Sequence, residues 1–139
     1  DPDKAEITES TKFSTLEETV QHVNLPVIYL KDSGDLKLSS ISADVILDEK
    51  PVLSIIYCNS NDNITILIYA HDSTNAISSS FATNYRIVSS NVGDVFVCES
   101  EDGANAYLFY DDYSIRINTS LDLSTFCTVL QSLAVFKLS

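Results

Sequence analysis

Short runs of strand-forming residues, separated by polar turn clusters, fill the chain from residue 27 to residue 118. The clearest pair is Val52–Cys58 and Ile64–Ala70, joined by the polar connection Asn59–Asn63. Two such runs around a short polar loop predict a β-hairpin. Both faces of these two runs are largely apolar, which is typical of central strands that are covered on both sides. We therefore expect a sheet built around this hairpin.

Weaker strand patterns flank the hairpin. They are Val27–Leu30, a run marked by Leu36, Leu38 and Ile41, and then Tyr85–Ser89, Val95–Glu99, Ala106–Tyr110 and Tyr113–Asn118. In the last run apolar and polar residues alternate, so we expect one of its faces to be solvated. Residues 71–83 are rich in Ser, Thr and Asn and predict a loop, with room for a short helix.

Helical spacing replaces the two-residue period near the N-terminus. Ser14 and Glu17 have the spacing of a capping box. Leu16, Val20 and Val23 then recur at i, i+4 and i+7, which predicts one apolar stripe on a helix. The helix should end before the proline at position 26, because the residue before a proline is disfavoured in the helical region.

A second helix is predicted near the C-terminus. Asp122 is its expected N-cap, and Leu121 and Phe126 occupy the positions of a hydrophobic staple. The expected apolar stripe of this helix is Phe126, Val129, Leu130 and Leu133.

Helices at the two ends and strands between them predict an α+β fold. We expect a curved antiparallel meander of seven or eight strands, with the N-terminal and C-terminal helices packed on one face. A chain of 139 residues suits a single domain. Residues 1–12 are polar and acidic and are interpreted as a linker or tail, which leaves residues 13–139 as the domain.

The charge balance narrows the classes of partner. The chain has 20 acidic and 8 basic residues, for a net charge of −12. This argues against unaided nucleic-acid binding and against an anionic membrane surface. Asp1-Pro2-Asp3-Lys4 does not resemble a signal peptide, so we expect a processed product or an excised fragment. Any signal or membrane anchor would then have preceded Asp1.

The three cysteines, Cys58, Cys98 and Cys127, form no close pair in the sequence. An odd number without C-x-x-C spacing disfavours both a disulfide framework and a zinc site. We interpret them as unreactive buried thiols, with one disulfide plus one free thiol as the alternative.

One short motif matches a catalytic pattern. Asp32-Ser33-Gly34 has the D-[ST]-G form found in aspartic peptidases, where two such aspartates share a proton. However, Lys31 rather than an apolar residue precedes it, and an apolar run ending in Gly-Arg is missing. We therefore interpret the motif as a turn. A hydrolase is the third choice of function, and the chain is expected not to be an enzyme.

Metal binding has two weak candidates. His71-Asp72 could act with Asp62 or His22, but the spacing follows no known metal motif. The acidic turns Glu99–Asp102 and Asp111–Asp112 could hold calcium loosely, although such turns are usually only solvated. No catalytic, cofactor-binding or metal-binding residue is assigned, and no cofactor is expected.

The stretch Val97–Leu133 resembles the end of a bacterial domain family of unknown function. The shared pattern is Ala106–Tyr110, the acidic turn Asp111-Asp112-Tyr113, the strand Ser114–Ile117 and a helix from Leu121 to Leu133 that finishes in Ser132-Leu133. Leu25-Pro26 and the segment from Pro51 to Ala70 could match earlier parts of the family, from about Leu16 onward. Phe109 stands where the family often has Trp, and Ser124 and Thr125 stand where it has acidic residues.

The family occurs outside the membrane in Gram-positive anti-sigma-factor-like and sporulation-associated proteins. The resemblance implies an extracytoplasmic domain, anchored by an upstream transmembrane helix, that senses or binds a peptide, a protein or a component of the cell envelope. It supplies no catalytic residues. The alternative is a secreted module that binds or inhibits a protein, with the acidic surface attracting a basic partner.

Overall fold

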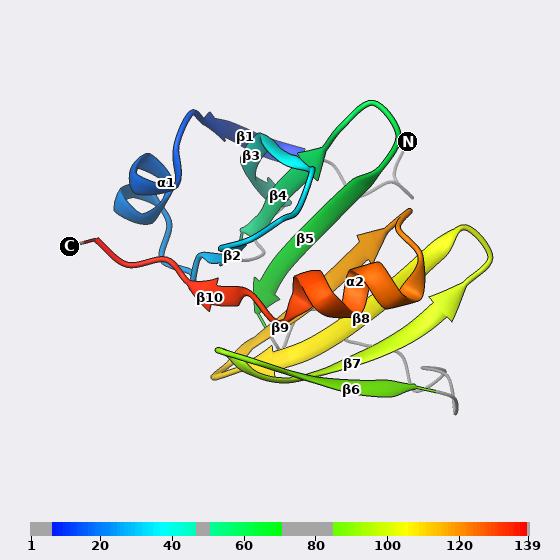
Figure 1. Ribbon diagram of the computed structural model, residues 1–139. Helices are drawn as coiled ribbons and strands as arrows, with labels where there is room; N and C mark the ends of the chain where they lie inside the picture. The colour runs from blue at the N-terminus through cyan, green and yellow to red at the C-terminus, as the bar shows by residue number, and fades with distance from the viewer. Residues whose placement is uncertain (1–6, 47–50, 71–84, 139) are drawn as a thin grey trace, which may run out of the picture.

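The protein is described here from a computed structural model, in which residues 7–46, 51–70 and 85–138 are described (Figure 1). Two helices and ten strands follow one another in this part of the chain. They are β1 (Ile7–Phe13), α1 (Leu16–His22), β2 (Ile28–Leu30), β3 (Lys37–Ile46), β4 (Val52–Cys58), β5 (Asn63–Ala70), β6 (Arg86–Ser90), β7 (Gly93–Ser100), β8 (Gly103–Tyr110), β9 (Tyr113–Thr119), α2 (Leu123–Leu130) and β10 (Leu133–Val135).

Eight strands form one antiparallel sheet in the order β1-β3-β4-β5-β9-β8-β7-β6. The sheet is therefore the main element, and the fold is mostly β with two helices rather than a balanced α+β arrangement. The predicted central hairpin is confirmed, with Ile55 opposite Ile66.

The strict meander is wrong at two places. The predicted strand Val27–Leu30 becomes β2, which pairs with β10 in a separate two-stranded sheet, and β5 pairs with β9 and not with β6. In this register Ile66 lies opposite Ile117 and Ile68 lies opposite Ile115. The pairing of β5 with β9 brings these isoleucine-rich strands together at the middle of the sheet, where each strand is paired on both sides. It leaves the more polar strands β1 and β6 at the edges, where burial is least complete.

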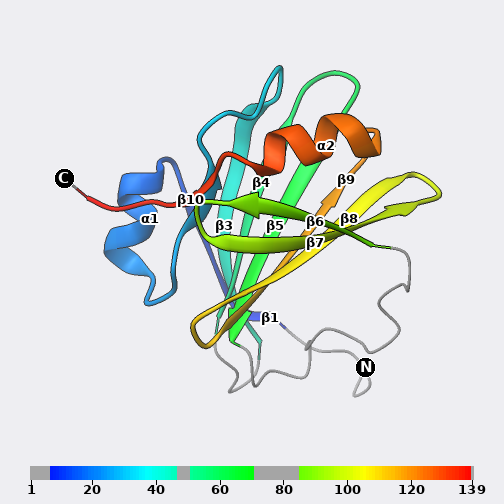
Figure 2. The ribbon, with the colours of Figure 1, turned by 60° about the horizontal axis from the view of Figure 1, so that its bottom comes forward.

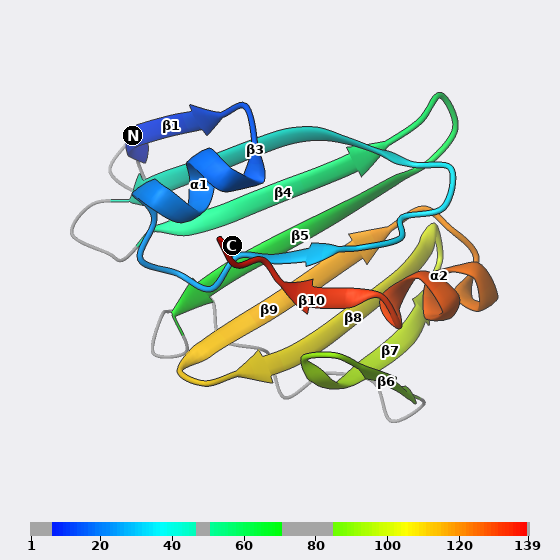
Figure 3. The same cartoon turned by 60° about the vertical axis from the view of Figure 1, so that its left-hand side comes forward.

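All the remaining elements lie on one side of the sheet. Figure 3 shows α1, the small sheet formed by β2 and β10, and α2 arranged across the same face, and Figure 2 shows α2 along it from another side. Fully buried residues of this layer, such as Phe126 and Leu130, belong to the same core as the inward-facing residues of the sheet. We call this covered side the inner face and the opposite side the outer face.

The predicted tail is wrong for residues 7–12. Ile7–Phe13 forms the edge strand β1, and Phe13 lies opposite Ile41 of β3. A polar sequence can form an edge strand because backbone hydrogen bonds to one neighbour hold it, without burial of both faces. Residues 1–6 lie outside the described residues.

The first helix begins one residue later than its capping pattern predicts. The Thr15 side chain, not that of Ser14, accepts a hydrogen bond from the Glu18 amide, at 3.0 Å. Thr19 is buried and donates its hydroxyl to the Thr15 carbonyl at 2.8 Å. The predicted apolar residue Val23 is the C-cap of α1.

The second helix has the predicted cap but is shorter than its apolar stripe. The Asp122 carboxylate accepts a hydrogen bond from the Thr125 amide at 3.4 Å, which confirms the N-cap. The helix ends at Leu130, and Leu133 lies in β10 opposite Leu30. Leu133 is buried as predicted, but its partners come from the small sheet because the turn after Leu130 redirects the chain.

One face of β9 differs from its prediction. Arg116 and Asn118 are half-buried on the outer face, but Ser114 is fully buried, so this face is not uniformly solvated. The predicted loop at residues 71–83 lies outside the described residues.

Candidate functional site

The turn between β2 and β3 is held by its own side chains. The Asp32 carboxylate accepts a hydrogen bond from the Gly34 amide at 3.0 Å, and Gly34 has a φ of 66° that suits glycine. The Ser33 hydroxyl donates to the Leu36 carbonyl at 2.6 Å. The Asp32-Ser33-Gly34 motif is thus a turn, as interpreted from its sequence, and its carboxylate has a role in fixing that turn.

Ser132, just after α2, fixes this turn beside the helix. Its hydroxyl oxygen accepts from the Asp32 amide at 3.1 Å, and its carbonyl accepts from the Lys31 amide at 3.1 Å. The Ser132 hydroxyl can donate to the carbonyl of either Asp32 or Val129, each at 2.9 Å. Residues about 100 positions apart in the chain are therefore held side by side.

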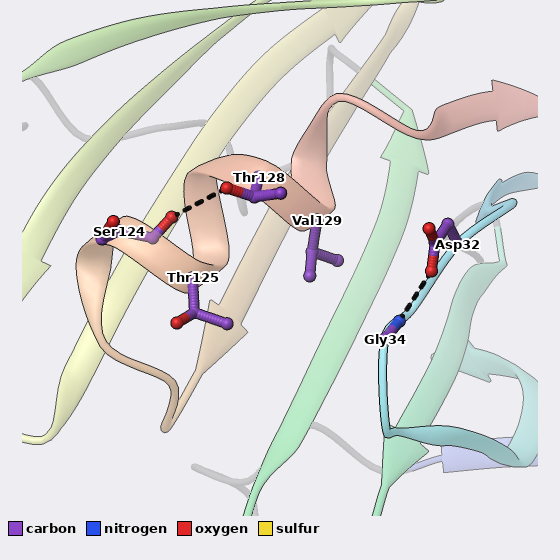
Figure 4. Close-up of a pocket in the computed structure, with 6 residues that line it drawn as sticks. All are labelled: Asp32, Gly34, Ser124, Thr125, Thr128 and Val129. Atoms are coloured by element: carbon purple, nitrogen blue, oxygen red, sulfur yellow. Dashed lines mark hydrogen bonds between the residues drawn. The ribbon is translucent and has the colours of Figure 1, made fainter.

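A cavity of about 370 Å³ lies between the turn and the helix (Figure 4). A second cavity of about 180 Å³ adjoins it and shares Gly34, Thr125 and Val129 with it. We call the two together the α2 groove. Its lining residues are Asp32, Ser33, Gly34, Asp35, Leu36, Asn59, Asp62, Leu121, Ser124, Thr125, Thr128 and Val129.

The polar lining of the α2 groove consists mainly of hydrogen-bond acceptors. Three carboxylates line it, from Asp32, Asp35 and Asp62, and among the described residues no Lys, Arg or His lines it. The carboxylate of Asp62 accepts from the Ser120 hydroxyl at 3.0 Å, which fixes its position. Because nothing in the lining neutralises these carboxylates, the groove favours positive charge.

The start of α2 adds to this negative character. Asp122 is its N-cap, and hydrogen bonds from the side chain and backbone of Thr125 lower the pKa of the Asp122 carboxyl. This negative charge offsets the partial positive charge of the helix N-terminus. The Ser124 carbonyl already accepts the Thr128 hydroxyl at 3.2 Å, as Figure 4 shows.

The sequence patterns did not single out most of this groove. The sequence marked Ser124 and Thr125 only as departures from the family pattern and gave no reason to single out Thr128. Thr128 lies three and four residues after Thr125 and Ser124, so the three hydroxyls are close together on the surface of α2. The tertiary structure places them across the cavity from Asp32. Of the residues weighed earlier as catalytic or metal-binding candidates, the groove includes Asp32-Ser33-Gly34 and Asp62.

The three cysteines are free and half-buried, so the alternative of one disulfide is excluded. They are less buried than predicted. Cys58 and Cys98 lie near the ends of β4 and β7, at positions that alternate with the buried residues of those strands. Cys127 is on α2.

The metal candidates do not come together within the described residues. His22 has its Nδ1 atom 2.9 Å from the Glu18 carbonyl, and its ring lies 5.8 Å from that of Phe13. The acidic turns Glu99–Asp102 and Asp111–Asp112 lie at opposite ends of β8. Among the residues that the structure describes, no group of three side chains is arranged to hold a metal ion. His71-Asp72 lies outside that part.

The chain matches no family model, and neither the curated proteins nor the solved structures contain a significant match to it. In the described part of the chain, neither helix has the length and apolar character that a membrane span requires. The interpretation of function therefore depends on the chemistry of the site.

Proposed function

We propose that this chain is a non-catalytic binding domain whose α2 groove takes a positively charged group from a peptide or protein partner. The observation that carries the proposal is the set of three uncompensated carboxylates along two adjoining cavities. An ammonium or guanidinium group offers only donors, which matches a lining of carboxylate, hydroxyl and amide oxygens.

The shape of the groove supports a long basic side chain. Leu36, Leu121 and Val129 give it apolar surface beside the acidic residues. Lys and Arg side chains bury their aliphatic stems on such surface and keep the charged end among polar groups. A net charge of −12 would also speed the approach of a basic partner. Each exposed charge pair contributes only about 0.2–1 kcal/mol, so one side chain should bind weakly.

The proposal extends to location. We place the domain outside the cytoplasmic membrane of a Gram-positive bacterium, on the pattern of residues 97–133 described above. A secreted module that binds or inhibits a basic protein is the alternative, and the acidic charge favours it equally. Protease added to intact cells that make the full-length protein should degrade the domain, and complete protection would contradict both locations. Retention of the protein on washed cells would favour the anchored form.

The test of the groove uses a matched pair of small ligands. N-acetylarginine methylamide carries a guanidinium, and N-acetylcitrulline methylamide has nearly the same shape without the charge. Titration followed by amide chemical shifts should show binding of the arginine compound at residues of the turn and α2. Binding should weaken as salt rises from about 0.01 M to about 1 M, because the screening length falls from about 30 Å to about 3 Å.

Isosteric variants locate the interaction. Asp35→Asn and Asp62→Asn should each weaken arginine binding about two- to fivefold, the effect of one exposed charge pair. Asp112→Asn removes the same charge at the β8–β9 turn, at the opposite end of β8 and β9 from Ser120 and Asp62, and should change binding little. Equal binding of the citrulline compound, or equal weakening by Asp112→Asn, would contradict a cation site in the groove.

A further inference from the structure

Arg116 lies on the outer face near the middle of the sheet, away from the α2 groove. It is on β9, directly between Tyr107 of β8 and Leu67 of β5. Its nearest neighbours on the outer face, along β9 and across to β5 and β8, are all uncharged. They are Thr65, Leu67, Tyr69, Asn105, Tyr107, Phe109, Ser114 and Asn118. Although the chain has 20 acidic residues, none of these described neighbours of Arg116 carries a carboxylate.

The guanidinium is held in place by an aromatic ring. Its central carbon lies 5.3 Å from the centre of the Tyr107 ring, which is within the range of a cation–π contact. The side chain is half-buried. Its Nε atom is buried and has no hydrogen-bond partner among the residues that the structure describes. A fixed, charged donor is therefore left without an acceptor.

Tyr69 supplies a second donor of the same kind. It lies on β5 beside Ser114, one position along the outer face from Arg116. The residue is only 3% exposed, and within the described part of the chain its hydroxyl has no hydrogen-bond partner. Burial raises the pKa of Tyr69, and the opposing effect of Arg116 is smaller. The hydroxyl therefore keeps its proton and remains a donor at neutral pH.

Buried donors without partners are rare in native proteins because each costs free energy. Here two of them, one of them charged, lie side by side on one face. Both require acceptor atoms, and the positive charge favours an anionic acceptor. We propose that Arg116 and Tyr69 form a binding site for a carboxylate group carried by a ligand with an apolar body.

The surroundings select this ligand chemistry. A carboxylate is planar and pairs with the fork of a guanidinium, whereas a phosphate dianion would be repelled more strongly by a chain of charge −12. Phe96 and Ile87 continue the row of Arg116 and Tyr107 toward the sheet edge. Phe109, one position along β8 from Tyr107 on the outer face, is 51% exposed, and Ile87, three strands away at the sheet edge, is 55% exposed, so apolar surface extends from the charged centre to that edge. The carboxylate can come from a chain end or small acid, or from a Glu side chain.

The two arginines of the chain, Arg86 and Arg116, make a direct test practical. The Nε–H signal of each can be followed in a nitrogen-15 correlation spectrum, and Arg86→Lys and Arg116→Lys assign them. Benzoate should shift the Arg116 signal in a saturable manner, and benzamide, its neutral counterpart, should not. N-acetylphenylalanine and N-acetylglutamate α-amide then distinguish a terminal carboxylate from a side-chain one. Saturation by either supports the site.

Variants distinguish this site from general attraction of anions. In the variants, binding is followed by the backbone amide signals of β8 and β9, because Arg116→Lys removes the Nε–H signal itself. Tyr69→Phe and Arg116→Lys should each weaken benzoate binding by about fivefold or more, through loss of a charge-assisted hydrogen bond. Arg86→Lys should leave it unchanged. Tyr69→Phe removes only an unpartnered oxygen, so its unliganded form should fold at least as stably as the parent.

Three outcomes would overturn the proposal. They are equal shifts with benzoate and benzamide, an equal loss of binding in Arg86→Lys and Arg116→Lys, and tighter binding of inorganic phosphate than of benzoate. None of these measurements involves the α2 groove, so the result is independent of the function proposed for it.

Discussion

Substituting Tyr57 by Phe should destabilise the protein through one hydrogen bond. The Tyr57 hydroxyl of β4 accepts from the Leu30 amide of β2 at 3.1 Å, and both residues are only 4% exposed. Burial raises the pKa of Tyr57, against the smaller effect of the Leu30 hydrogen bond, so the phenol is neutral at pH 7. This bond joins the small β2–β10 sheet to the main sheet. Its loss would leave the Leu30 amide buried without an acceptor.

The cost of such an unpaired donor is about 1–3 kcal/mol. For a domain of this size, about 1 kcal/mol corresponds to roughly 4 °C in Tm. Tyr57→Phe should therefore lower Tm by about 4–12 °C. Because the ring remains, the cavity left behind is smaller than a methyl group, and packing loss adds little.

Tyr69→Phe is the matched control, since it removes the same atom from another buried tyrosine. Within the described residues the Tyr69 hydroxyl has no hydrogen-bond partner, so the substitution leaves no other polar group unpaired. Stability should stay the same or rise by up to about 1 kcal/mol. Urea unfolding followed by circular dichroism measures both variants, and the chain has no Trp to report by fluorescence. Equal losses in the two variants would refute the assignment of the Leu30–Tyr57 bond as the source of the effect.

Two further predictions concern backbone conformation and pH. Gly103→Ala should lower the free energy of unfolding by about 3 kcal/mol or more, because φ is +154° and a Cβ there would meet the Thr119 carbonyl. Gly93 has φ +115° but open space around it, so Gly93→Ala should cost only the backbone strain of about 1–3 kcal/mol. Equal losses of stability in urea unfolding would contradict the close approach of β8 and β9. The lowered pKa of Asp122 means that its contribution to stability is present above its ordinary value of 3.8 and is lost as pH falls through the lower folded value. Asp122→Asn keeps the cap acceptor for Thr125 but should remove this part of the acid dependence. If the parent and Asp122→Asn gave the same curve of Tm against pH, from pH 6 to pH 2, the contribution of Asp122 to the acid dependence would be contradicted.

Local patterns in the sequence were sufficient for several elements. Two largely apolar runs around a polar turn located the hairpin Val52–Cys58 and Ile64–Ala70, and Asp122 marked the start of α2. These features depend on contacts within a few residues, so the order of residues alone predicts them. The covering of a sheet by two helices followed from their apolar stripes.

The tertiary structure decided what depends on distant segments. Pairing of β5 with β9 replaced the expected meander, and a polar segment became the edge strand β1 because β3 offered it backbone partners. The α2 groove exists because Ser132 holds the Asp32 turn beside the helix. Arg116 and Tyr69 are diagonal neighbours only because of the β5–β9 register. Periodicity records which side of a strand is apolar. Periodicity does not indicate which strand pairs with which, because strand pairing depends on packing energy summed over the whole core.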